Sequence, residues 1–161
     1  MSEVNQAFIA ECRSLLVKDY LPKIERSVEL LSDEQIWWRA NPSSNSIGNL
    51  LLHLGGNVRQ WIVVGLGGAT DTRDRDAEFA QRDVISRDEL LNRLRQTLRE
   101  ADETLAEFDA KRLLDPFTIQ GLQVSALAAI LHVVEHFSMH AGQILYITKL
   151  LSSSDLHFYD L

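Results

Sequence analysis

Residues 125–151 read SALAAILHVVEHFSMHAGQILYITKLL, and this stretch decides the fold. Its apolar residues recur at helical spacing, and the stretch contains no Pro to interrupt a helix. We predict a helix of about 26 residues that begins after an N-cap at Ser125 and reaches Leu151. Long helical periodicity of this kind is the strongest structural signal in the chain.

The same periodicity predicts three more long helices. Pro22 predicts a kink in the first of them, Ser46 is a good N-cap for the second, and Ser86 with Glu89 forms a capping box for the third. The four helices are expected over residues 2–31, 47–64, 86–108 and 126–151. We therefore predict an all-α fold, a four-helix bundle.

Two connections interrupt this pattern. Residues 69–85 are rich in charge and form a long polar connection between the second and third helices, where Arg73, Arg75 and Glu78 suit either a solvated surface or an ion-pair clasp. Residues 117–124 are predicted to form a short extended or hairpin segment before the fourth helix.

The composition is that of one globular domain covering residues 1–161. Hydrophobic residues make up 45% and charged residues 24% of the chain, and the formal charge is −7. A negative surface without a basic cluster excludes nucleic acid as a favoured partner and leaves small molecules or a second copy of the chain.

The cellular setting is predicted from cysteine usage and hydropathy. The single cysteine, Cys12, excludes an intrachain disulfide and a Cys-based metal cluster, which favours the cytoplasm. The acidic, polar first residues do not resemble a signal peptide, and no apolar run approaches the roughly 20 residues of a membrane span. We therefore expect no membrane association.

Four of the five histidines lie on two predicted helices. His53 falls on the apolar face of the second helix, and His132, His136 and His140 share one face of the fourth. A lone histidine on an apolar face is more often a hydrogen-bonded core residue, but two histidines one turn apart with a third on a neighbouring inward face favour a divalent metal. Spacing allows either His136 with His140 or His132 with His136 as the pair on one helix, with His53 as the third ligand.

Residues 132–136, HVVEH, also match the H-x-x-E-H pattern of a class of zinc proteases. The helical angle places Glu135 about 100° away from His136, toward the flank of the helix. Only 25 residues follow His136, and they offer no second ligand-bearing helix. The protease interpretation is therefore disfavoured.

Several polar and aromatic residues lie beside the histidines. Asn57 and Gln143 are each within one helical turn of a histidine and could orient a metal ligand, bind substrate or bond to neighbouring groups. Trp38 and Trp61 could line the mouth of a pocket or pack in the core. His132, if it is not a ligand, belongs to the same surroundings.

The fourth helix is apolar almost all round. Leu127, Leu131, Val134 and Leu145 lie opposite the histidine face and need a cover. The first helix and the tail, with Phe158 and Tyr159 docking it, are one possible cover, and a second subunit is the other. We expect a homodimer.

These segments resemble the DinB-like (YfiT-like) superfamily of metal-binding four-helix bundles. The resemblance rests on residues 49–54, NLLLHL, followed by Asn57 and Trp61, and on residues 136–144, HFSMHAGQI. It covers nearly the whole chain, and its most specific part is the His-x3-His-x-Gly-Gln stretch.

The resemblance implies a three-histidine site in which His53, His136 and His140 bind zinc or nickel, often in a dimer. Relatives with known activity are thiol-dependent transferases or isomerases that use mycothiol or bacillithiol, or are described as hydrolases. Many relatives carry two adjacent histidines where this chain has Met139 and His140. The ligand is retained here, and a residue that supports it is replaced.

Three protein ligands leave an open position on the metal, as in catalytic zinc sites. Because the inward arcs around His53 and His136 carry no Asp or Glu, a metal-bound low-molecular-weight thiol is favoured over metal-bound water. We therefore expect a thiol-dependent transferase acting on small electrophiles. A metal-dependent hydrolase and a non-catalytic metal- or ligand-binding stress protein are the alternatives.

Overall fold

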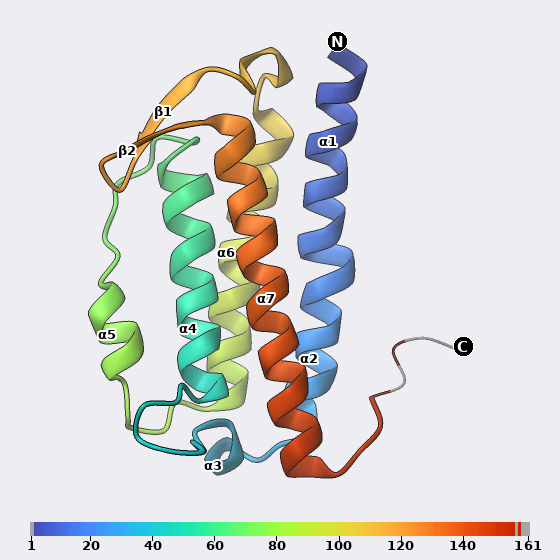
Figure 1. Ribbon diagram of the computed structural model, residues 1–161, viewed down its shortest axis with the longest axis vertical. Helices are drawn as coiled ribbons and strands as arrows, with labels where there is room; N and C mark the ends of the chain where they lie inside the picture. The colour runs from blue at the N-terminus through green and yellow to red at the C-terminus, as the bar shows by residue number, and fades with distance from the viewer. Residues whose placement is uncertain (1, 157, 159–161) are drawn as a thin grey trace.

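The structure is a computed structural model that describes residues 2–156 and 158. Four long helical rods pack side by side around a shared apolar core (Figure 1). The first rod is α1 (Ser2–Ser14), a π-helical turn η1 (Leu15–Tyr20) and α2 (Leu21–Glu29). The predicted helical bundle is confirmed.

The first rod continues through Pro22. Tyr20 and Leu21 keep right-handed helical dihedral angles, and Pro22 occupies the first turn of α2. Pro has no N–H and crowds the preceding turn, and the wider π-helical turn lies directly before it. The interruption predicted at Pro22 therefore takes the form of a widened turn in the residues before it.

The second and third rods begin where the sequence predicts. The second is α4 (Ile47–Val58), which continues into the π-helical turn η2 (Arg59–Val64), and the third is α6 (Arg87–Glu107). The Ser46 hydroxyl accepts a hydrogen bond from the backbone N–H of Asn49, which satisfies one of the free N–H groups of the first turn.

The predicted capping box of α6 forms only in part. The Ser86 hydroxyl accepts from the backbone N–H of Glu89, as expected. The Glu89 carboxylate, however, pairs with Arg93 one turn later. An i,i+4 ion pair has replaced the second half of the box.

A short hairpin leads into the fourth rod. Strands β1 (Pro116–Ile119) and β2 (Leu122–Ser125) pair antiparallel through a turn in which Gln120 and Gly121 have φ of 53° and 76°. Ser125 then caps α7 (Ala126–Ser152) by accepting from the N–H of Ala128. The hairpin and the N-cap agree with the prediction.

The polar connection contains a helix that the sequence did not predict. Helix α5 (Arg75–Ala80) lies outside the bundle beside α4 (Figure 1). Asp74 caps it by accepting from the N–H of Ala77. Two smaller turns complete the chain, α3 (Asp33–Ile36) after the first rod and η3 (Ala110–Arg112) after the third.

The core is built from aliphatic side chains of all four rods. Phe137 of α7 is fully buried and stacks against Tyr20 at a ring-centroid distance of 6.0 Å. Trp37, after α3, closes one end of the core and donates its indole N–H to the Ile85 carbonyl. The largest fully buried side chains are Phe137, Ile24, Ile36, Ile47, Leu51, Leu54, Ile62, Leu90, Leu94, Leu98, Leu105 and Leu113.

The described part of the tail turns back toward α2. Leu156 is buried, and the Arg26 guanidinium lies 5.6 Å from the ring centroid of Phe158. Tyr159, which was expected to dock the tail, lies outside the described residues. Among the helices of the described residues, none combines the length and the hydropathy of a membrane span.

A glycine of α4 is predicted to be essential for packing. A Cβ at Gly48 would lie 2.7 Å from Cε2 of Trp37, so Gly48→Ala should destabilise the protein by about 1–3 kcal/mol despite the better helix propensity of Ala. Urea denaturation measures this change.

Gly55→Ala in the same helix is the control. Its Cβ would meet only Thr97 Oγ1, at 3.9 Å, and the variant should gain about 0.5–1 kcal/mol. Equal effects of the two substitutions would show that Trp37 does not limit the space at Gly48.

Candidate metal centre

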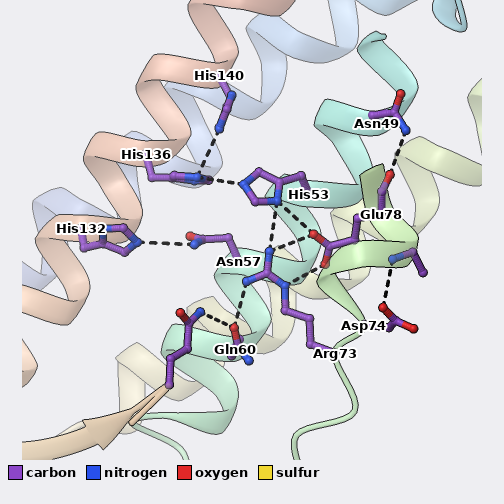
Figure 2. A network of polar contacts seen from close by, with 12 residues as sticks. Asn49, His53, Asn57, Gln60, Arg73, Asp74, Glu78, His132, His136 and His140 are labelled. Atoms are coloured by element: carbon purple, nitrogen blue, oxygen red, sulfur yellow. Dashed lines mark hydrogen bonds and ion pairs between the residues drawn. The ribbon is translucent and has the colours of Figure 1, made fainter. Parts of the chain in front are cut away.

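Helices α4 and α7 bring three imidazoles together in the interior of the bundle (Figure 2). The Nε2 atom of His136 lies 3.0 Å from Nε2 of His53 and 3.2 Å from Nε2 of His140. One nitrogen from each of the three rings lies within 4.8 Å of the others. His53 and His140 are buried, and His136 is partly buried.

Two of the rings are oriented by partners on their outer nitrogens. His53 Nδ1 lies 2.9 Å from Glu78 Oε2, and His140 Nδ1 lies 2.7 Å from Gln143 Oε1. Both partners are acceptors, so each Nδ1 carries the proton and donates it outward. An Arg73 nitrogen also lies 3.1 Å from His53 Nδ1, but this nitrogen is already bonded to Glu78 Oε2 at 2.9 Å, and the charge-assisted bond from His53 to the carboxylate is the stronger one. Each neutral ring therefore directs an unprotonated Nε2 toward the centre, the arrangement that metal-binding histidines show.

Because His53 and His140 carry their protons on Nδ1, neither ring has an N–H to donate toward the centre. Only His136 could place a proton on Nε2, and it could donate that proton to one neighbour at a time. At least one buried lone pair would then have no partner, which is unfavourable in an apolar interior. A cation among the three nitrogens satisfies all of them.

The spacing also fits a metal ion. Zinc–nitrogen bonds of about 2.0–2.1 Å at tetrahedral angles separate the nitrogens by roughly 3.4 Å, close to the two separations above. The three histidines could therefore hold a divalent ion with a fourth position open.

The surroundings of His136 and His140 favour the neutral imidazole, which is the form that binds metal. Burial, with the neighbouring His140 and His53, lowers the pKa of His136 to about 3. Burial also lowers the pKa of His140, although its hydrogen bond with Gln143 acts in the opposite direction. These two rings do not need to lose a proton to bind metal at neutral pH.

Glu78 of α5 is the main functional residue that the sequence did not assign to the site. Its side chain is 11% exposed and forms a two-pronged ion pair with Arg73, with distances of 2.7 and 2.9 Å. Burial raises the pKa of Glu78, but hydrogen bonds from Arg73 and His53 outweigh this, and the pKa lies below its usual value. A carboxylate therefore lies beside the site, although the inward arcs of α4 and α7 carry none.

The clasp alternative for the polar connection is correct for Arg73 and Glu78. Arg75 has another role, because its guanidinium lies 5.1 Å from the ring centroid of Phe79. The Phe79 ring in turn covers His53 at 4.6 Å between centroids. Helix α5 thus forms one wall of the centre.

Two features of α4 hold α5 in place. A Cβ at Gly56 would lie 1.9 Å from Glu78 Oε1, so only glycine lets this carboxylate pass. The Asn49 side chain donates to the Glu78 carbonyl at 2.8 Å and to the Gln81 carbonyl at 3.2 Å. A glycine in the middle of a predicted helix was the available signal that another group approaches there.

The remaining predicted site residues separate into two groups. His132 lies beside the centre, with Nε2 at 3.5 Å from Asn57 Nδ2 and its ring 4.2 Å from that of Trp61. Gln143 supports His140 as described. Trp38, which follows α3, is 38% exposed and belongs to the end of the bundle.

Glu135 of the alternative protease pattern is exposed on α7. Its carboxylate therefore does not point into the bundle interior with the three histidines. The structure agrees with the lower weight given to the protease interpretation.

The helical bundle, in which α4 and α7 carry the three histidines, has the fold of DinB-like proteins. The crystal structure of a DinB-like protein from Bacillus cereus ATCC 10987 is similar with a TM-score of 0.65 and 17% identity, over 82% of this chain and 85% of that chain. A conserved protein from Enterococcus faecalis gives a TM-score of 0.68 and 14% identity, over 96% and 98%.

The sequence itself gives the family. Residues 3–160 match the model of DUF1572, described as a protein of unknown function, and the chain belongs to this family. Comparison with curated proteins gives no significant match.

The lowered pKa of His136 predicts the pH dependence of stability without metal. Between its usual value of 6.5 and about 3, the unfolded chain binds a proton at this position that the folded chain does not. The free energy of unfolding should therefore fall as the pH is lowered through this range. Guanidinium denaturation of chelator-treated protein at about pH 7.5 and pH 5 measures the slope.

His136→Gln is the comparison for this experiment. The variant lacks the titrating group and should show a smaller decrease in stability over the same pH range. If wild type and variant lose stability equally, the folded protein does not hold His136 neutral.

Proposed function

We propose that this protein binds a divalent metal ion, zinc or nickel, through His53, His136 and His140. The observation that carries the proposal is the set of three Nε2 atoms that face one another, two of them fixed as unprotonated by Glu78 and Gln143. Imidazole ligands suit both metals, so supply and geometry decide between them.

We further propose that the site activates a low-molecular-weight thiol for transfer to a small electrophile. A bound divalent ion lowers the pKa of a thiol or of water at its open position. Glu78 is unsuited to be the base for water, because both its oxygens are engaged by Arg73 and His53. A thiol does not need such a base, which supports the transferase.

The chain's own residues would orient and shield this chemistry. Glu78 and Gln143 hold two rings in the metal-binding tautomer, and Phe79 covers His53 on the outer side. Thiol co-substrates are maintained in reducing compartments, so the proposal includes a cytoplasmic location. It also treats the chain as one domain.

Metal content and turnover test this function together. His140→Ala should reduce zinc or nickel from about one ion per chain to nearly none, as measured by elemental mass spectrometry, and should abolish turnover. His132→Ala is the matched control on α7, because its nitrogens are outside the three-atom group, and it should keep the metal.

The assay uses mycothiol, bacillithiol or glutathione with halogenated or epoxide substrates. Thiol-dependent turnover by metal-loaded wild type supports the transferase. Hydrolysis without a thiol would replace it with the hydrolase, and full metal occupancy in His140→Ala would refute the assignment of this ligand.

We also propose that the protein is a homodimer that joins through α7. One side of this helix exposes four large apolar side chains by 49–70%, those of Leu131, Met139, Tyr146 and Leu150. Val134, by contrast, is buried within the chain. The described tail packs toward α2, and the four side chains on this side of α7 stay exposed.

A charge on this surface should separate the subunits. Met139→Glu should shift the protein from dimer to monomer in sedimentation equilibrium, because the carboxylate would be buried without a partner. Val4→Glu on α1, where the valine is 73% exposed, is the control and should leave the mass unchanged. A wild-type monomer at micromolar concentration would contradict the dimer.

A further inference from the structure

Three residues that contact His132, beside the metal centre, carry unpartnered polar atoms. Among the described residues, four buried side-chain nitrogen or oxygen atoms have no hydrogen-bond partner. Three of them are Asn57 Oδ1, Trp61 Nε1 and His136 Nδ1, and the fourth is Thr148 Oγ1. Such atoms are rare in folded proteins because each loses its bonds to water, so three on residues around one histidine call for an explanation.

His132 connects the three groups. Its ring lies 4.2 Å from that of Trp61 and 5.6 Å from that of His136, and its Nε2 lies 3.5 Å from the Asn57 amide nitrogen. Asn57 and Trp61 are only 4% and 6% exposed. Figure 2 shows Asn57 between His132 and the clasp residues, on the side of His53 and His136 away from His140.

Rotation of the amide does not remove the deficit. Whichever end of Asn57 faces His132, the contact is at the limit of a hydrogen bond and the other end has no partner. Asn57 thus offers a donor and an acceptor that the folded chain leaves largely unused.

The other two groups are donors. The indole nitrogen of Trp61 can only donate. When His136 uses Nε2 as a metal ligand, the proton of its neutral ring is on Nδ1, which then also donates. The local deficit is therefore mainly one of acceptors, and a carbonyl or carboxylate oxygen is the group that corrects it.

We propose that Asn57, Trp61 and His136 form a recognition subsite for a carbonyl-type oxygen, a carboxamide or a carboxylate, of the molecule that reacts at the metal centre. This inference rests on the proposed metal function and names the chemistry of its substrate. Asn57 would accept from an N–H or O–H of the same molecule. Neighbouring Arg73 is already paired with Glu78, so recognition depends on directional hydrogen bonds.

The indole N–H signals of the protein test the subsite directly. The three tryptophans give separate reporters in a proton–nitrogen NMR spectrum: Trp61 is buried without an acceptor, Trp37 is bonded to the Ile85 carbonyl, and Trp38 is at the surface. Zinc-loaded protein is titrated with acetate and with acetamide. We expect the Trp61 signal to move downfield and saturate, while the Trp37 signal stays in place.

The two probes distinguish the two sources of the oxygen. A stronger response to acetate assigns the subsite to a carboxylate, and a stronger response to acetamide assigns it to a carboxamide. No saturable response of Trp61 to either probe overturns the proposal. A long-lived water contact at the Trp61 indole without any response would show that water alone fills the place.

Asn57→Leu provides a second test, which distinguishes a role of Asn57 in binding from a role in stabilising the fold. Replacing an unsatisfied amide by a side chain of similar size should raise the melting temperature, while the affinity for acetamide, whose N–H the Asn57 oxygen would accept, falls about fivefold. Unchanged acetamide affinity in this variant also overturns the subsite.

Metal-free protein separates this inference from the proposed function. Trp61 and Asn57 do not depend on metal for their hydrogen-bonding character, so a response of Trp61 there supports the subsite even if metal uptake fails. Metal content, measured on the same samples, reports independently on the three histidines.

Discussion

The structure depends on the convergence of three imidazole nitrogens inside an apolar bundle. Nε2 of His136 lies 3.0–3.2 Å from the other two, which requires α4 and α7 to keep a fixed register over their central turns. Neutral nitrogens at this distance are compatible only if a proton or a cation lies between them. The protein directs the protons of His53 and His140 outward, and this makes a cation the better partner.

Helix α5 is best explained by the same requirement. A buried ion pair such as Arg73–Glu78 adds little net stability, because removing two charges from water offsets their attraction. Gly56, which lets Glu78 approach α4, lowers helix propensity by about 1 kcal/mol relative to Ala. The buried ion pair and the glycine are both explained if Glu78 must hold the proton of His53 on Nδ1. The polar connection with α5 thus serves to orient the ring of His53 and to fix its proton.

The sequence predicts those parts that rest on periodicity and local capping. Apolar spacing and the N-caps at Ser46 and Ser125 locate α4 and α7, and with them the inward histidines. Spacing alone could not choose between His132 and His140, because both are one turn from His136. Glu78 could not be placed at all, since its role arises from contacts between α5 and α4 that are distant in sequence and leave no periodic pattern.

The two flanks of the centre differ in how completely their polar groups are satisfied. On the flank of Glu78 and Gln143 every outward nitrogen has an acceptor, and the rings are held firmly. On the flank of Asn57 and Trp61 the folded chain leaves one acceptor, Asn57 Oδ1, and one donor, Trp61 Nε1, without partners among the described residues. Folding alone would favour full pairing or apolar replacement on both flanks. An incomplete flank beside a complete one is expected where a bound molecule supplies the missing partner, and this asymmetry is the physical basis of the subsite proposed at Asn57 and Trp61.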